Sequence, residues 1–293
     1  MGPPLARPLE DKVAVVTGAT SGIGRQVAYR LALDGATTVV VGRGAARAEA
    51  TSRELAIATG NPRVPWIGVS DLADLADCRR VAREVRERFP KVAILVNNAG
   101  AYFRHRKTTR DGLERTFALN VLAPFVLTTE LEGVLRTGAP SRVVQVASAA
   151  HRGYTIDLSD LQSERAYRGF AAYGRSKLAL LLLTREFARR WPATGVTINA
   201  VHPGLVRSGF GRNNAGATAL MIRVASVLFG TSILRGADTP VFVASDPSVA
   251  GISGEYFVRR RTARGSAASR DTEAAARLFH KCAELAGTTV ATQ

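Results

Sequence analysis

The feature that most constrains the fold is a regular alternation of short apolar runs with longer amphipathic segments. The first run, residues 12–17, is rich in valine, as expected of a strand buried on both faces. A glycine-rich turn and an amphipathic helix ending near Leu33 follow it. Strands that alternate with helices of this length indicate βαβ units and a parallel sheet. No Pro/Ser-rich linker interrupts the pattern. The sequence therefore predicts an α/β fold with one domain, a doubly wound Rossmann-type parallel sheet with helices on both faces.

The expected order of elements leaves one long irregular insert. Further strands are predicted at residues 38–41, 64–69, 92–96, 142–147, 197–201 and 255–258, and helices at residues 45–58, 75–89, 111–135, 170–190 and 237–245. The insert, at about residues 205–235, contains a compact apolar stretch at residues 220–229. We interpret it as a lid that excludes water from an apolar substrate, with an oligomer contact or plain packing as the alternatives.

Composition bounds the class of protein. A chain of 293 residues that is 46% hydrophobic can bury a sizeable core, and no run of eighteen apolar residues suggests a membrane span. The first ten residues lack an apolar signal core, so we expect a cytoplasmic protein. Cys78 and Cys282 stand alone without CxxC spacing, which fits a reducing compartment and argues against a disulfide framework or structural metal.

The net charge of +16 raises the question of nucleic-acid binding. Only five of the 40 basic residues are lysine, and the arginines are scattered, with one short run at residues 259–261. Together with abundant alanine, this composition is typical of a GC-rich bacterial genome. We therefore expect an anionic ligand and no nucleic-acid partner, an interpretation that a salt-dependent shift with duplex would contradict.

Residues with functional chemistry stand at the predicted carboxyl ends of strands, where open α/β sheets bind their ligands. Thr17, Asn97, Ser148 and His202 all occupy such ends. Between the first strand and helix lie the turn residues Gly18, Thr20, Ser21, Gly22, Ile23 and Gly24. Their spacing differs from GxGxxG, but a glycine turn before a helix lets the backbone approach a pyrophosphate. This context predicts a dinucleotide cofactor.

The end of the second strand indicates which dinucleotide. An acidic residue there would hold the adenosine ribose, but the strand ends in Gly42-Arg43. Arg43, with Arg47 one helical turn later, suits a 2′-phosphate because a guanidinium can bind it in a bidentate way. Two solvated helix arginines are the alternative. We predict NADP(H) rather than NAD(H).

Tyr173 and Lys177 lie four residues apart in a segment of strong helix formers, and thus on one helix face. An ordinary phenol titrates near ~10, and a fixed cation beside it is expected to lower its pKa. Tyr173 is therefore a candidate general acid and base. A surface tyrosine and lysine at this spacing by coincidence are the alternative.

These motifs, in this order, resemble the short-chain dehydrogenase/reductase family over about residues 9–287. The resemblance rests on Thr17-Gly18-x3-Gly22-Ile23-Gly24, Asp71-Leu72, Asn97-Asn98-Ala99-Gly100, Asn120, Ser148, Tyr173-x3-Lys177 and Pro203-Gly204. The stretches around Ser148 and Tyr173 are most similar to the retinol-dehydrogenase-like branch. Its C-terminal helix implies a helical tail at about residues 271–287. The vertebrate members' apolar N-terminal anchor is not seen here, so we expect no membrane attachment.

The resemblance implies roles for individual residues. Tyr173 would donate and accept the proton, Ser148 would hydrogen-bond the substrate oxygen, and Asn120 would support a water relay to Lys177. Lys177 would also hold the nicotinamide ribose and, with the positive nicotinamide ring, lower the pKa of Tyr173. The remaining cofactor contacts would come from Asp71, Leu72, Asn98, Ala99, Gly100, Pro203, Gly204, Val206 and Ser208.

Departures from the family pattern are few. Ser208 stands where threonine is usual, Ala147 where a second serine is frequent, and Val121 where the branch often has histidine. These departures leave the identity of the substrate undetermined, whereas the expected activity is kept. We expect His151 to shape the substrate cleft and His202 to pack or hydrogen-bond at its strand end. No His, Asp, Glu or Cys set has metal-ligand spacing, so we predict no metal site.

These observations predict an NADP-dependent ketone or aldehyde reductase that acts on an apolar small molecule. Oxidation of a steroid- or retinoid-like alcohol, reduction of a C=C bond, and a catalytically silent NADP(H)-binding sensor are the alternatives. The family resemblance further implies a homo-oligomer, a dimer or tetramer formed through the long helices.

Overall fold

An eight-stranded sheet organises the protein, for which a computed structural model describes residues 7–204, 206 and 232–288. The strand order is β3-β2-β1-β4-β5-β6-β7-β8, and all pairs are parallel except β7 with β8. The strands are β1 (Val13–Thr17), β2 (Thr37–Arg43), β3 (Trp66–Val69), β4 (Ile94–Asn97), β5 (Ser141–Val146), β6 (Val196–His202), β7 (Tyr256–Val258) and β8 (Arg261–Thr262). The predicted doubly wound sheet is thus confirmed. The antiparallel strand β8 was missed because two residues carry no periodic pattern.

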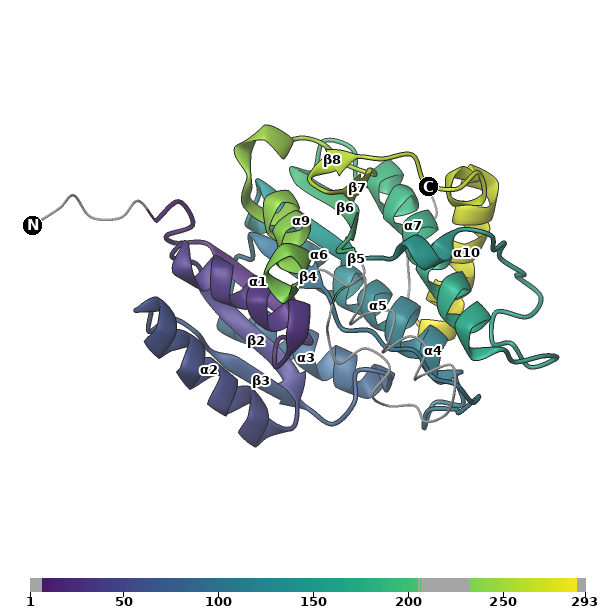
Figure 1. The fold of residues 1–293 in the computed structure, drawn as a ribbon, viewed down its shortest axis with the longest axis horizontal. Coiled ribbons are helices and arrows are strands. Elements are labelled where there is room, and N and C mark those ends of the chain that lie inside the picture. The colour runs from purple at the N-terminus through teal and green to yellow at the C-terminus, as the bar shows by residue number, and fades with distance from the viewer. Residues whose placement is uncertain (1–6, 205, 207–231, 289–293) are drawn as a thin grey trace, which may run out of the picture.

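Helices cover both faces of the sheet (Figure 1). One face packs against α1, α2 and α9 and the other against α3, α5 (Ala123–Glu130) and α7, so two hydrophobic cores form, one on each side. The main helices are α1 (Gly22–Leu33), α2 (Ala45–Thr59), α3 (Leu75–Arg88), α7 (Gly169–Arg190), α9 (Ile233–Ser245) and α10 (Thr272–Ala286). Most of the predicted lid lies outside the described residues, and so does Ser208. No described helix is both long and apolar enough to cross a lipid bilayer.

The prediction of a single helix at residues 111–135 is wrong. The chain instead forms α4 (Arg115–Phe117), a π-helical turn (Ala118–Leu122), α5 (Ala123–Glu130) and α6 (Glu132–Thr137). Glu114 caps α4 by accepting hydrogen bonds from two backbone N–H groups. The helix therefore begins at Arg115, after the predicted start. The wider π turn has no periodic signature in the sequence, and such turns are frequent at functional sites. This turn contains Asn120.

The tail helix α10 lies beside α7 (Figure 1), close to the predicted range. The ring of Phe279 on α10 packs 5.1 Å from Phe125 on α5 and 5.0 Å from Phe187 on α7, measured between centroids. Trp191 extends this cluster at 5.1 Å from Phe187. Because α10 covers apolar parts of α5 and α7, association of copies through these two helices would have to use surfaces that α10 leaves free.

Candidate active site

Tyr173 and Ser148 meet at the carboxyl edge of the sheet. Ser148 follows β5, whereas Tyr173 lies in the first turns of α7 and is only 7% exposed. The phenol is hydrogen-bonded to the Ser148 hydroxyl, which also accepts a hydrogen bond from the N–H of Ala150 at 3.2 Å. Two hydroxyl groups that the chain separates by twenty-five residues therefore face one point in space.

Lys177 follows one helical turn later and is 4% exposed. Its ammonium donates a hydrogen bond to the carbonyl of Val146 at 2.8 Å and lies 5.7 Å from the centroid of the Tyr173 ring. The expected helix face thus carries both groups. The alternative of a surface tyrosine and lysine is wrong, because both side chains are buried.

The pKa values differ from the sequence expectation. Burial raises the pKa of Tyr173 to about 12, although the hydrogen bond with Ser148 acts to lower it. Burial also lowers the pKa of Lys177 to about 8. The expected lowering of the phenol pKa by the neighbouring cation is therefore not found in the chain alone. Desolvation disfavours both charged forms, and the Lys177 ammonium is directed at Val146.

Asn120 is held rigidly beside Lys177. Its side-chain oxygen accepts a hydrogen bond from the N–H of Ala101 at 2.9 Å, and its NH₂ donates to the carbonyl of Ala101 and the hydroxyl of Ser176, each at 2.9 Å. Gly100 separates the two functional groups. A Cβ there would lie 3.0 Å from Asn120 Oδ1 and 3.3 Å from Lys177 Nζ. The glycine keeps this space open, and the water relay stays a prediction.

Ser176 was not singled out by sequence reasoning. Its hydroxyl accepts from Asn120 and donates to the carbonyl of Tyr173 at 2.7 Å, so it links the π-helical turn to α7. The sequence feature that could have identified Ser176 was its position between Tyr173 and Lys177.

The glycine turn fits the pyrophosphate of a dinucleotide. Gly18 has a φ of +65°, and a Cβ on Gly24 would lie 2.5 Å from the carbonyl oxygen of Gly18. Ser21 precedes α1 without a capping side-chain hydrogen bond, and no acidic side chain lies in the first turn. The N-terminus of α1, which is the positive end of the helix dipole, is therefore available to bind an anion.

Hydrogen bonds between Thr17 and Asn98 lie directly before the glycine turn and join it to the neighbouring strand. The Thr17 hydroxyl accepts hydrogen bonds from the N–H groups of Asn98 and Ala99, both at 3.0 Å, and the Asn98 side chain donates to the Thr17 carbonyl at 2.9 Å. Asn98 and Ala99 therefore shape the predicted cofactor site by joining β1 to β4. Their direct contacts to a cofactor stay predictions.

Arg43 and Arg47 lie together at the same edge of the sheet. Arg43 ends β2 and Arg47 lies in the first turn of α2, and both side chains are exposed. Within the described part of the chain, neither pairs with a carboxylate. Thr20 packs against this strand end, because a Cβ on Gly42 would lie 2.1 Å from the Thr20 methyl group.

The other predicted cofactor residues are placed as follows. Asp71 is ion-paired with Arg115 at 2.5 Å, and the side chain of Leu72 is buried in the core, so only its backbone could face a ligand. Pro203 and Gly204 follow β6, and Val206 packs against α9, where a Cβ on Gly236 would lie 2.6 Å from it.

His151 does not line an open cleft, contrary to expectation. It is fully buried, and its two ring nitrogens contact the carbonyl of Ser148 and the N–H of Ser266. His202 does hydrogen-bond at its strand end, accepting from the N–H of Ala149 at 3.3 Å. Burial lowers both pKa values, that of His202 to about 4. Both rings are therefore neutral groups that support the segment of residues 148–152, called the Ser148 loop below.

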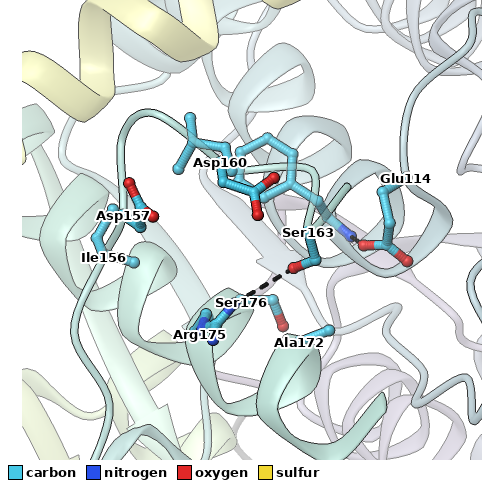
Figure 2. Close-up of a pocket in the computed structure, with 10 residues that line it drawn as sticks. Glu114, Ile156, Asp157, Asp160, Ser163, Ala172, Arg175 and Ser176 are labelled. Carbon is cyan, nitrogen blue, oxygen red and sulfur yellow. Dashed lines mark hydrogen bonds between the residues drawn. The ribbon is translucent and has the colours of Figure 1, made fainter. Parts of the chain in front are cut away.

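A small, partly open pocket lies beside Ser176 (Figure 2). It is lined by Glu114, Asp157 and Asp160, and across it Arg175 donates to the Ser163 hydroxyl at 3.4 Å. Its volume of about 20 Å³ suits a single water molecule and is too small for a substrate.

The chain is similar to known oxidoreductases. The short chain dehydrogenase family profile matches residues 12–218. Retinol dehydrogenase 14 from Homo sapiens is 37% identical over 263 residues, covering 85% of this chain and 78% of the relative. An uncharacterized protein from Mycobacterium paratuberculosis aligns with a TM-score of 0.77 at 28% identity, over 97% of this chain and 96% of its own. A protein assigned as an NAD(P)-dependent gluconate 5-dehydrogenase from Beutenbergia cavernae, solved with bound NADP, has a TM-score of 0.68 at 30% identity, over 87% and 97%.

Proposed function

Because the chain belongs to the short chain dehydrogenase family, in its retinol-dehydrogenase-like branch, we propose that it reduces a ketone or aldehyde on an apolar small molecule with NADPH. The observation that carries this proposal is the hydrogen bond between the buried phenol of Tyr173 and the hydroxyl of Ser148. Together the two groups can hold one substrate oxygen and supply its proton.

Tyr173 holds the proton that reduction of a carbonyl requires. A phenol whose pKa is raised to about 12 is neutral at physiological pH and carries the proton that a developing alkoxide needs. Ser148 donates a hydrogen bond to the same oxygen and stabilises its charge as the proton moves. When bound, NADPH supplies the hydride. The buried ammonium of Lys177 adds positive charge beside the phenolate that remains after transfer.

The cofactor assignment rests on charge at the end of β2. Two exposed guanidinium groups, from Arg43 and Arg47, lie where an acidic residue would select NAD(H), and each can bind a phosphate through paired N–H donors. The similar Beutenbergia structure contains NADP at low occupancy. We assign NADP(H) to this chain, and Lys177 to its nicotinamide ribose.

Calorimetric titration of the purified protein with NADPH and NADH tests the cofactor assignment. We expect preference for NADPH in the wild type, and an affinity lowered roughly tenfold or more by Arg43→Ala, since one charge-assisted hydrogen bond contributes ~1.5–3 kcal/mol. Arg53→Ala is the control because Arg53 lies exposed on α2, the helix that follows Arg43, and pairs with Glu49. Equal binding of both cofactors would contradict the assignment to NADP(H).

A second candidate is the oxidation of an apolar alcohol such as a retinoid, which the name of the human relative supports. A panel of aliphatic, aromatic and retinoid carbonyls with NADPH, and the matching alcohols with NADP⁺, separates the two directions by absorbance at the nicotinamide band. Cofactor binding without turnover on any member would favour the silent sensor instead.

A further inference from the structure

The His151 side chain hydrogen-bonds the backbone of the proposed catalytic serine, and the proposed reaction has no step for it. The ring is fully buried and packs edge-on against Tyr256, with centroids 5.4 Å apart. Nδ1 lies 2.7 Å from the carbonyl oxygen of Ser148, and Nε2 lies 3.2 Å from the backbone nitrogen of Ser266. One imidazole thus spans from the active-site loop to the segment that precedes α10.

The contacts of the ring decide its tautomer. The N–H of Ser266 can only donate, so Nε2 must be the acceptor. The proton therefore sits on Nδ1 and is donated to the carbonyl of Ser148. A protonated ring would lose the contact with Ser266, and burial favours the neutral form.

The segment around Ser266 is closed by a local hydrogen bond and linked to the Ser148 loop. The Ser266 carbonyl accepts from the hydroxyl of the fully buried Ser269 at 2.7 Å. The neighbouring Arg152 donates to the carbonyl of Arg264 at 3.0 Å, so the Ser148 loop has two links to this segment. His202 holds the N–H of Ala149 from the other side. The loop is therefore fixed by groups from β6 and from the C-terminal region.

We propose that His151 is a positioning residue, which fixes the backbone of Ser148 through its Nδ1–H and so aims the Ser148 hydroxyl at Tyr173 and the substrate oxygen. The proposal rests on the proposed function of Ser148. The backbone N–H of His151 also donates to the Ser148 carbonyl, at 3.3 Å, and the shorter side-chain contact adds to this hold. A displacement of about 1 Å at a reacting group can lower turnover on the order of 100-fold.

Three substitutions separate the two contacts of the ring. His151→Asn places an NH₂ group near the Nδ1 position and keeps the donor to Ser148. His151→Gln places an oxygen near the Nε2 position and keeps the acceptor for Ser266. His151→Phe keeps the packing against Tyr256 and loses both hydrogen bonds. His105→Asn, at an exposed histidine, is the control.

We expect kcat to stay within about threefold of wild type in His151→Asn and to fall by about 10- to 100-fold in His151→Gln and His151→Phe, with unchanged affinity for NADPH. Unfolding midpoints report the structural role separately. Wild-type kcat in His151→Gln together with reduced kcat in His151→Asn would overturn the proposal, because the contact with Ser266 would then be the important one.

A double-mutant cycle tests whether His151 acts through Ser148. Ser148→Ala keeps the backbone carbonyl and removes only the hydroxyl. In that background, His151→Phe should cause no further fall in the residual kcat, although it should still lower the unfolding midpoint. An equal fall in both backgrounds would overturn the proposal.

A readout without turnover separates this inference from the proposed function. Nitrogen-15 NMR of the histidine rings should show His151 as the neutral Nδ1–H tautomer at neutral pH, and a neutral Nε2–H tautomer would overturn the proposal. A wild-type protein with this tautomer but no turnover on any carbonyl would instead count against the proposed function.

Discussion

The ammonium of Lys177 donates its hydrogen bond to the carbonyl of Val146, the last residue of β5, at 2.8 Å. A buried cation is thus attached to the strand that leads into Ser148. This attachment holds α7 and β5 at the distance at which Tyr173 reaches Ser148. Burial of the ammonium lowers the pKa of Lys177 to about 8.

Lys177→Met should make the cofactor-free protein more stable at neutral pH while abolishing turnover. The pKa is about 8 in the fold and 10.5 in an unfolded chain, so folding with a charged Lys177 costs roughly 3 kcal/mol below pH 8. The difference should vanish as the pH rises towards 10.5. Urea unfolding of both proteins at pH 7 and pH 10 measures it, and a less stable variant at pH 7 would contradict the prediction.

Tyr173→Phe should keep affinity for NADPH and lose turnover by about 10²- to 10⁴-fold, the usual contribution of a positioned acid. Tyr29→Phe, on α1, is the control for loss of a phenol hydroxyl. Single-turnover absorbance at the nicotinamide band measures the chemical step. Undiminished turnover in Tyr173→Phe would exclude the phenol as the proton donor.

Phe170 should contribute to selection of an apolar substrate. Its side chain remains 43% exposed one helical turn before Tyr173, and its ring centroid lies 6.2 Å from that of Tyr173 and 6.3 Å from that of Tyr102. We expect Phe170→Ala to raise KM for bulky apolar carbonyls about tenfold, as a lost apolar contact of ~1–3 kcal/mol implies. KM for a small polar carbonyl should barely change. Equal effects on both substrates would refute the contact.

Acid should destabilise the fold through His202. Its pKa is about 4 in the fold, lowered by burial and by the nearby His151, Arg152 and Arg259. An unfolded histidine binds its proton near ~6.5, so the stability is complete above that pH and is lost as the pH falls towards 4. We expect a loss of about 3 kcal/mol over this range.

His202→Asn should flatten this pH dependence, because an amide oxygen can accept from the N–H of Ala149 without titrating. Urea unfolding at pH 4.5 and pH 7 compares the two proteins, and His105→Asn is the control. An unchanged slope in His202→Asn would assign the acid sensitivity to other groups.

Glu186→Gln should destabilise the protein by about 2 kcal/mol or more at neutral pH. This carboxylate is 2% exposed and pairs with Arg189 at 2.8 Å and Arg190 at 2.7 Å. Burial raises its pKa, but the two guanidinium groups outweigh burial and hold it below its ordinary value.

The stability from Glu186 is therefore present above about pH 4.5 and lost as the pH falls through the folded pKa. The difference between Glu186→Gln and wild type should shrink at acid pH. Denaturant unfolding at pH 3.5 and pH 7 tests this, and a constant difference would show that packing and not charge is lost.

Local pattern was enough for the fold class. The valine-rich run at β1 and the glycine turn before α1 have the expected elements because their signals arise from neighbours in the chain. The same reasoning failed at the π-helical turn around Asn120, where one extra residue per turn changes the hydrogen bonding but not the apolar pattern. It also assigned His151 to the cleft, since its partner Ser266 is 115 residues away.

The sequence by itself determined the sheet, the order of the motifs and the helical spacing of Tyr173 and Lys177. Only the tertiary structure decided that the phenol meets Ser148, that burial raises the pKa of Tyr173, and that His151 supports the serine from behind. The physical reason is the range of the interactions. Helix and strand periodicity depend on residues a few positions apart, whereas desolvation and hydrogen-bond geometry at the site are sums over segments that only folding brings together.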